Sequence, residues 1–92
     1  MEINTKSICV FRYGCVVDGV AGAAKATYGF HVLSGGLMEI TNSASLGYVF
    51  FRSCDTGILA DTGGIVTGIT NTQFSGCTSN YTADAATFAL IN

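Results

Sequence analysis

Gly57–Val66 reads GILADTGGIV, in which two short apolar segments flank an acid and two adjacent glycines. A similar stretch, GFHVLSGGLM, begins 28 residues earlier at Gly29, and a third, NYTADAATFA, begins 23 residues later at Asn80. Internal repeats of this length are typical of solenoid proteins, in which each unit is too small to bury its own apolar face. The recurrence therefore predicts a β-solenoid made of stacked units.

Alignment of the three copies predicts two short strands and two bends in each unit. Glycine and asparagine tolerate positive φ, so the column that begins each copy is expected to be a tight turn before the first strand. The glycine doublets predict the second bend, and Leu37, Ile65 and Phe88 are expected to lie on the second strand. The expected structural turn residues are Gly29, Gly35, Gly36, Gly57, Gly63, Gly64 and Asn80.

The composition favours strands and a partner chain. The 92 residues include 12 Gly and no Pro, and Val, Ile and Thr, which favour strands, are abundant. We expect strands in GFHVLSG, GYVFFRS and GITNTQFSG, and either a short helix or an irregular connection at Gly19–Thr27. Hydrophobic residues make up 49% of a chain that buries only about 60 to 65% of its unfolded surface, so some apolar surface is expected to meet other protein.

Charge and targeting signals exclude several classes of protein. Four scattered Lys and Arg residues against six Asp and Glu residues give a net charge of −2, which leaves no basic patch for nucleic acid. No run of about 18 apolar residues predicts membrane insertion. The N-terminus MEINTKSICV lacks the basic start and apolar core of a signal peptide, so we expect a chain made in the cytoplasm.

The four cysteines, Cys9, Cys15, Cys54 and Cys77, are compatible by number with two disulfides or a metal site. Their spacing contains no Cys-x-x-Cys, and His31 is the only histidine. Without a secretory signal we expect buried free thiols that pack as small apolar side chains, no metal and no cofactor.

The pattern Gly-apolar-x-apolar-x-x-Gly-Gly/Ser-x-apolar, with Asn-containing links, resembles the right-handed parallel β-helix segments of bacteriophage tail fibres and tailspikes. The resemblance covers residues 28–92 and implies an all-β fold, a short right-handed parallel β-helix in a homotrimer. It further implies a non-enzymatic virion protein, part of a tail fibre, tailspike or capsid-surface fibre, made in the host cytoplasm. Other virion proteins and host-surface glycans are its expected partners.

Residues 1–27 are expected to be an atypical N-terminal cap within the same single domain. They contain a further resemblance to the motif, GCVVDGVA, which begins at Gly14. This copy stands only 15 residues before Gly29, too close for one full turn of a solenoid. Atypical terminal units are expected at the ends of such folds.

Longer proteins of this resemblance cleave polysaccharides, so a polysaccharide depolymerase, or a fragment of one, is the alternative function. Its candidate catalytic acids are Asp61 and Asp84, which share a column of the alignment. Neighbouring strands lie about 4.8 Å apart, close to the roughly 5 to 5.5 Å between the carboxylates of retaining glycosidases. The competing interpretation is an Asx turn that repeats because the bend repeats. A bacterial adhesin module is a third alternative.

Binding residues are the least determined part of the sequence. His31, Tyr48 and Tyr81 are candidates for contact with glycans, and the competing role for each is in the core or at a subunit interface. The C-terminal segment Thr87–Asn92, TFALIN, has no polar cap. It is expected to be buried against a partner chain or to complete a neighbour's sheet, since exposed strand edges are normally covered.

Overall fold

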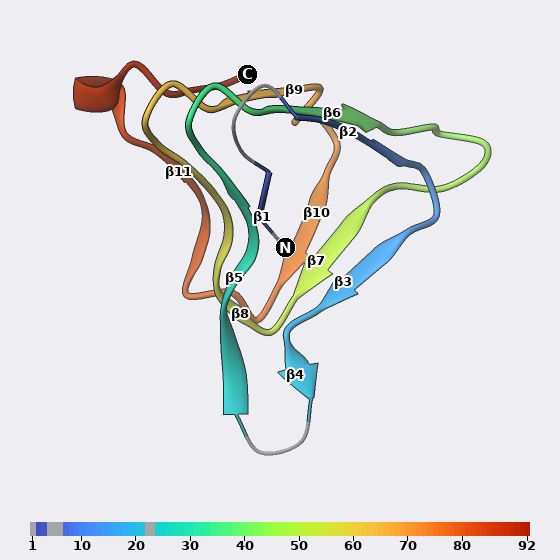
Figure 1. Ribbon diagram of the computed structural model, residues 1–92. Helices are drawn as coiled ribbons and strands as arrows, with labels where there is room; N and C mark the ends of the chain where they lie inside the picture. Colours follow the sequence, from blue (N-terminus) through green and yellow to red (C-terminus); the bar gives the residue numbers. More distant parts are fainter. Residues whose placement is uncertain (1, 4–6, 22–23) are drawn as a thin grey trace.

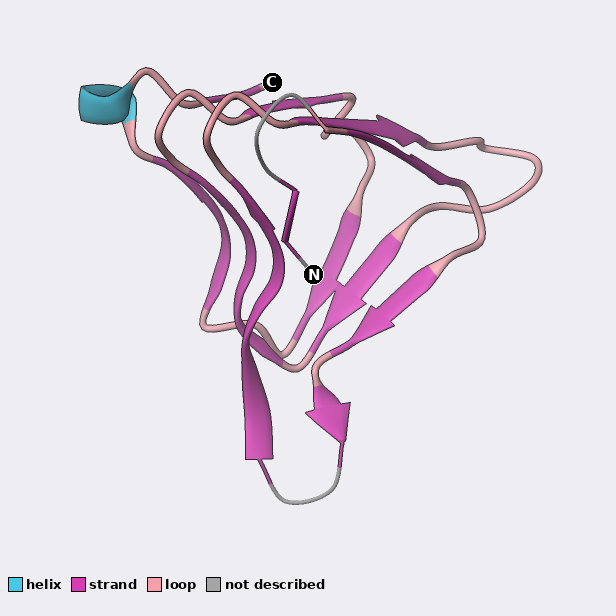
Figure 2. Cartoon of the chain, in the orientation of Figure 1, coloured by secondary structure: helices cyan, strands magenta, loops and turns pink. Residues whose placement is uncertain are grey.

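The computed structural model describes residues 2–3, 7–21 and 24–92, and in this part of the chain it is all-β, with one 3-10 turn and no α-helix (Figures 1 and 2). The expected fold class is therefore confirmed at the level of an all-β protein. The strands are β1 (Glu2–Ile3), β2 (Ile8–Arg12), β3 (Val16–Asp18), β4 (Val20–Ala21), β5 (Ala24–Val32), β6 (Leu37–Thr41), β7 (Phe50–Arg52), β8 (Cys54–Ala60), β9 (Ile65–Thr67), β10 (Gln73–Ser75), β11 (Ser79–Ala83) and β12 (Leu90–Ile91), and the 3-10 turn is η1 (Ala85–Thr87).

Three sheets built from parallel strand pairs enclose the core and lie on the sides of a triangle (Figure 1). Sheet A has the order β1-β5-β8-β11, sheet B the order β2-β6-β9-β12, and sheet C the order β3-β7-β10. The chain passes from sheet A to B to C and then begins again, so each passage, here called a circuit, lays its strands beside those of the previous one. The only antiparallel strand in the described part is β4, which pairs with β5.

The register of sheet A confirms the alignment of the first strand of each repeat. Phe30 and Tyr81 both pair with Ile58, on either side of β8, as the sequence columns require. In sheet B, Leu37 pairs with Ile65 as expected. The partner of Ile65 on its other side is Leu90, however, so the placement of Phe88 on the second strand was wrong.

The cause is a longer corner in the last circuit. In the third circuit the chain runs from Ala60 to its next paired residue Ile65, whereas in the fourth it runs from Ala83 to Leu90. The extra length forms η1, which places Phe88 at the corner rather than in the sheet. Corners tolerate insertions that a paired strand does not, because a slip in register would turn side chains to the opposite face.

The first column of the motif lies inside strands, which corrects the prediction that Gly29, Gly57 and Asn80 form turns. A Cβ on Gly29 would stand 2.5 Å from the carbonyl oxygen of Gly57, and one on Gly57 would stand 2.5 Å from that of Asn80. Each glycine thus lets the next strand approach closely, as glycine does in strand interiors. Asn80 lies on the last strand of sheet A, with no described strand beyond it, so a side chain fits there.

The glycine doublets do form the second bend. Gly35 and Gly63 each have φ of 77°, a left-handed conformation that favours glycine. Gly36 and Gly64 follow directly, and the Gly64 amide donates to the Asp61 carbonyl 2.9 Å away, which closes the turn.

The N-terminal segment contributes to all three sheets through β1, β2 and β3. The motif copy at Gly14 leads into β3, which pairs with β7 in sheet C rather than with the strands of sheet A. Within Gly19–Thr27, where a helix or an irregular connection was expected, β4 and the start of β5 form an antiparallel pair; residues 22–23 lie outside the described part of the chain.

Apolar side chains fill the triangle, and no polar side chain of the described residues is buried. Phenylalanine rings dominate: Phe30 lies edge-on to Phe51, at a centroid distance of 5.7 Å, and Phe51 stacks on Phe74 at 5.4 Å. The four cysteines are free thiols, as expected. Cys54 is buried and Cys9 and Cys77 are partly buried, but Cys15 is exposed, which corrects the expectation that every thiol is buried.

We expect Gly57→Ala to lower the free energy of unfolding by about 1 to 3 kcal/mol, because the new methyl group meets the Asn80 carbonyl and a Phe74 ring carbon 2.8 Å away. Asn80→Ala is the matched control on the outermost strand and should change stability by less than about 0.5 kcal/mol. Chemical denaturation of both variants measures the difference. Equal stability of the two variants would contradict the close strand approach at Gly57.

Candidate functional site

The outer face of sheet B carries one aliphatic side chain from each of its four strands. The register places Ile8 beside Leu37, Leu37 beside Ile65, and Ile65 beside Leu90. Ile8 is 70% exposed, Ile65 38% and Leu90 48%, and Leu37 is half-buried. These four residues form a straight row across the strands, which we call the aliphatic ladder.

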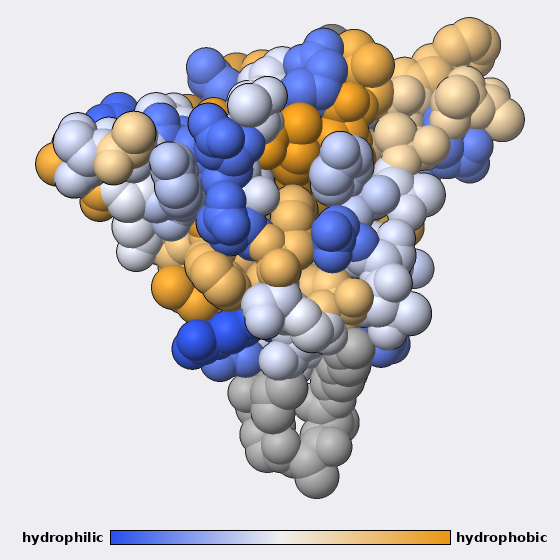
Figure 3. Space-filling model, turned by 180° about the vertical axis from the view of Figure 1, so that it is seen from behind, coloured by the Kyte–Doolittle hydropathy of each residue, from blue (hydrophilic) through white to orange (hydrophobic). Residues whose placement is uncertain are grey.

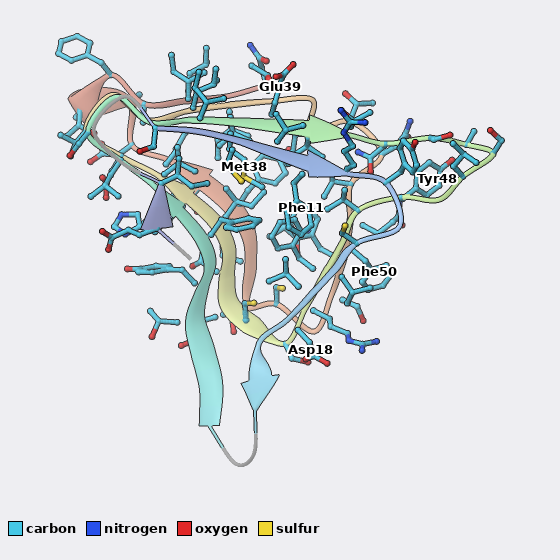
Figure 4. The ribbon with its side chains drawn as sticks, turned by 45° about the vertical axis from the view of Figure 1, so that its right-hand side comes forward. Phe11, Asp18, Met38, Glu39, Tyr48 and Phe50 are labelled. Atoms are coloured by element: carbon cyan, nitrogen blue, oxygen red, sulfur yellow. The ribbon has the colours of Figure 1, made fainter. Side chains whose placement is uncertain are left out.

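The alternation of side chains along each strand produces this row. In β6, Met38 is fully buried and its neighbours Leu37 and Glu39 lie on the opposite face. Figure 4 shows Met38 pointing into the core and Glu39 pointing away from it. A second outward column, Val10, Glu39 and Thr67, runs beside the ladder and is mostly polar. The outer face of sheet B is thus an apolar row with a polar neighbour.

Phe88 adds a large ring at the corner between sheets A and B. It follows η1 with φ of 63° and ψ of 25°, and its side chain is 88% exposed. Its backbone amide donates to the Ala85 carbonyl at 3.1 Å, which ends the 3-10 turn. The corner that carries η1 stands at the upper right of Figure 3, where the surface is apolar.

This conformation at Phe88 is a strained one. A bulky residue in the left-handed region costs of order 1 to 2 kcal/mol, and such strain gathers at functional sites. An exposed phenylalanine is also unfavourable in water, so Phe88 is both strained and unburied within a single chain. Phe88 and the aliphatic ladder together have the character of a protein-binding surface, since exposed apolar rows rimmed by polar residues mark such sites.

On the outer face of sheet A, His31 and Asp61 form a second group. The His31 Nε2 and Asp61 Oδ2 atoms are 2.8 Å apart, with the side chains 21% and 26% exposed. The ring of Tyr28 lies beside His31 at a centroid distance of 5.1 Å. The sequence did not indicate this pairing, because the two residues are 30 positions apart and meet only through the stacking of β5 on β8.

The two candidate acids have separate partners. The Asp61 carboxylate binds His31, whereas an oxygen of Asp84 accepts a hydrogen bond from the Ala86 amide at 3.1 Å and caps η1. The Asx-turn interpretation is therefore confirmed for Asp84 and wrong for Asp61. Their shared column in the sequence does not give the two carboxylates a shared function.

Tyr48 and Tyr81 are both partly exposed but lie on different elements from His31. Tyr48 follows the Ser43–Gly47 turn and precedes β7, and Tyr81 lies on β11 with its ring 5.9 Å from that of Phe74. Of the three candidate glycan-binding residues, only His31 has an aromatic ring and a carboxylate beside it on the same outer face.

Within residues 2–3, 7–21 and 24–92, no group of three or more His, Cys, Asp or Glu side chains is placed to hold a metal ion. No helix in the same part of the chain is long and apolar enough to span a membrane. The ladder itself escaped the sequence analysis: Leu37 and Ile65 were aligned, but Ile8 and Leu90 join them only through the register of sheet B.

Comparison with known proteins leaves this geometry as the main guide to function. A scan of protein-family models, a search of curated proteins and a search of solved structures each found no match to this chain.

We expect Phe88→Gly to be more stable than Phe88→Ala by about 1 kcal/mol, because glycine adopts φ of 63° without strain whereas alanine does not. Thermal or chemical denaturation at the lowest workable protein concentration measures this difference in the dissociated chain. Equal stability of the two variants would show that Phe88 is not held in the left-handed region.

Proposed function

We propose that the protein is a non-enzymatic structural subunit, a short right-handed parallel β-helix that forms a homotrimer in a bacteriophage tail fibre, tailspike or capsid-surface fibre. The observation that carries the proposal is the aliphatic ladder with the strained, exposed Phe88 at its corner. Such a subunit acts through association with copies of itself and with other virion proteins rather than through chemistry.

The β-helix assignment is supported by the cyclic order of the strands. Parallel strands from successive circuits lie side by side in each of three sheets, and the chain visits the sheets in a constant order. One circuit contributes only short strands, so its inward side chains are covered by the circuits on either side. Resemblance of the GILADTGGIV motif to phage β-helix segments adds the virion context.

The trimer is supported by the direction of the aliphatic ladder. The row crosses all four strands of sheet B, and thus runs along the direction in which the circuits stack. Three chains side by side can align their ladders around a common axis and bury them together. Aliphatic cores of this kind, surrounded by polar rims, are typical of homo-oligomer interfaces.

Polysaccharide cleavage has weaker support than a structural role. The Asp61 and Asp84 carboxylates bind different partners, and the Asp84 interaction belongs to the cap of η1. Loss of glycan cleavage in Asp61→Asn at unchanged stability would favour the depolymerase. Loss of stability without any cleavage to lose would favour the structural role.

We expect Ile65→Lys to weaken the homotrimer by about 2 kcal/mol or more per chain, because it places a charge in the centre of the buried ladder. Thr67→Lys is the matched control: it lies on the same strand, in the polar column beside Glu39, and should change assembly by less than about 0.5 kcal/mol. Light scattering across a dilution series measures the mass of each. A trimer that survives Ile65→Lys would refute the ladder interface, and a wild-type chain without a threefold assembly would refute the trimer.

A second role, contact with host-surface glycans, is favoured by the Tyr28, His31 and Asp61 group, which places an aromatic ring beside hydrogen-bonding side chains on an outer face. We expect Tyr28→Ala to lower binding to a glycan array by about tenfold, which corresponds to the loss of a ring contact worth about 1.4 kcal/mol. Tyr48→Ala is the matched control and should leave binding unchanged. Equal effects of the two variants would place the glycan elsewhere.

A further inference from the structure

The three sheets end together on one side of the molecule. In the part of the chain that the structure describes, β10, β11 and β12 are each the last strand of their sheet, with no strand paired beyond them. We call these three strands the open end. Every residue from 27 to 92 is described with its burial, so the open end is seen whole.

The core is uncovered at the open end. In one inward column of sheet A, Phe30 is 2% exposed and Ile58 is 0% exposed, but Tyr81, the next member, is 46% exposed. In the neighbouring column, Val32 and Ala60 are fully buried and Ala83 is exposed. The side chains of the last circuit point toward the same core as their predecessors but lack a circuit above them.

The backbone of β11 also has one unused side. The Asp84 amide donates to the Ala60 carbonyl at 2.9 Å, so the even-numbered amides of this strand face β8. Successive backbone groups of a strand point to opposite sides, and the amides of Ser79, Tyr81 and Ala83 therefore face away from β8. An edge of this kind is a template for another strand.

None of the usual protections of an edge strand is present. From residue 62 to residue 92 the only charged residue is Asp84, and there is no proline in the chain. Natural edge strands are commonly blocked by lysine, proline or a bulge. The open end instead presents Ser79, Tyr81 and Ala83 without a charge among them.

We propose that the open end pairs with the open end of a second copy of this chain through a twofold axis, β11 running antiparallel to β11 of the partner. The opposite end of sheet A is a poor match, because β1 contributes only Glu2–Ile3 and carries a carboxylate, whereas β11 is a five-residue uncharged edge. A twofold contact closes on itself, while head-to-tail stacking would extend without limit. The pairing stands independently of the sheet B trimer.

Tyr81→Pro tests the pairing against Tyr81→Ala. Proline removes the outward amide of an edge strand, alanine keeps it, and both remove the ring. Light scattering should show that the mass of the wild-type assembly is halved in Tyr81→Pro and unchanged in Tyr81→Ala. If the sheet B trimer also forms, the halving leads to trimers; if it does not, the halving leads to monomers, so the two interfaces are judged separately.

Thr82→Lys adds a variant on the outer face of the same edge, paired with Leu59, where the side chain has room and the native strand pairing stays intact. It should also halve the mass while circular dichroism remains that of the wild type. Hydrogen exchange at the Tyr81 amide should slow as the wild-type concentration rises. Unchanged mass in both Tyr81→Pro and Thr82→Lys, or concentration-independent exchange at Tyr81, would overturn the proposal.

Discussion

Close approach between strands of successive circuits is the constraint on which this structure depends. Gly57 accepts the Asn80 carbonyl where a methyl group would stand 2.5 Å from it, and Gly29 accepts the Gly57 carbonyl in the same way. Such contacts leave little freedom for register, so residues of equivalent position in each circuit line up. The columns inside the triangle become the aromatic and aliphatic core, and the columns outside become continuous rows on the surface.

Variation is confined to the corners because the sheets do not allow it. The longest corner segment between two paired strands lies between β6 and β7, where Asn42 stabilises the chain: its amide donates to the Thr70 carbonyl at 2.9 Å and its Oδ1 accepts from the Val49 amide at 2.6 Å. The corner before β12 contains η1 and ends at Phe88. Insertions at corners change what the molecule presents to others while the stacked strands remain in register.

The aliphatic ladder and the open end are two consequences of one regular pattern. Side by side, circuits repeat an outward aliphatic position until it becomes a binding row, and at the last circuit the inward positions continue without cover. A small all-β chain with so little charge has few means of keeping such surfaces in water. Its stability and its association are therefore linked, and the strain at Phe88 is tolerated where contact with another chain offsets it.

The sequence by itself determined the strand content and most of the repeat. Phe30, Ile58 and Tyr81 align by simple spacing and do share a column, because each copy of the motif carries the same alternation of apolar residues. The bends at Gly35 and Gly63 were also predictable, since positive φ is a local requirement that glycine meets.

Only the tertiary structure decided what depends on the next circuit. Gly29 and Gly57 lie within strands because a neighbouring carbonyl needs the space, and a sequence pattern cannot distinguish this need from that of a turn. His31 meets Asp61, and Ile8 joins the ladder, through contacts between residues about 30 positions apart. Leu90 rather than Phe88 pairs with Ile65 because η1 absorbs the extra residues of the last corner, and that shift is visible only when the strands are laid side by side.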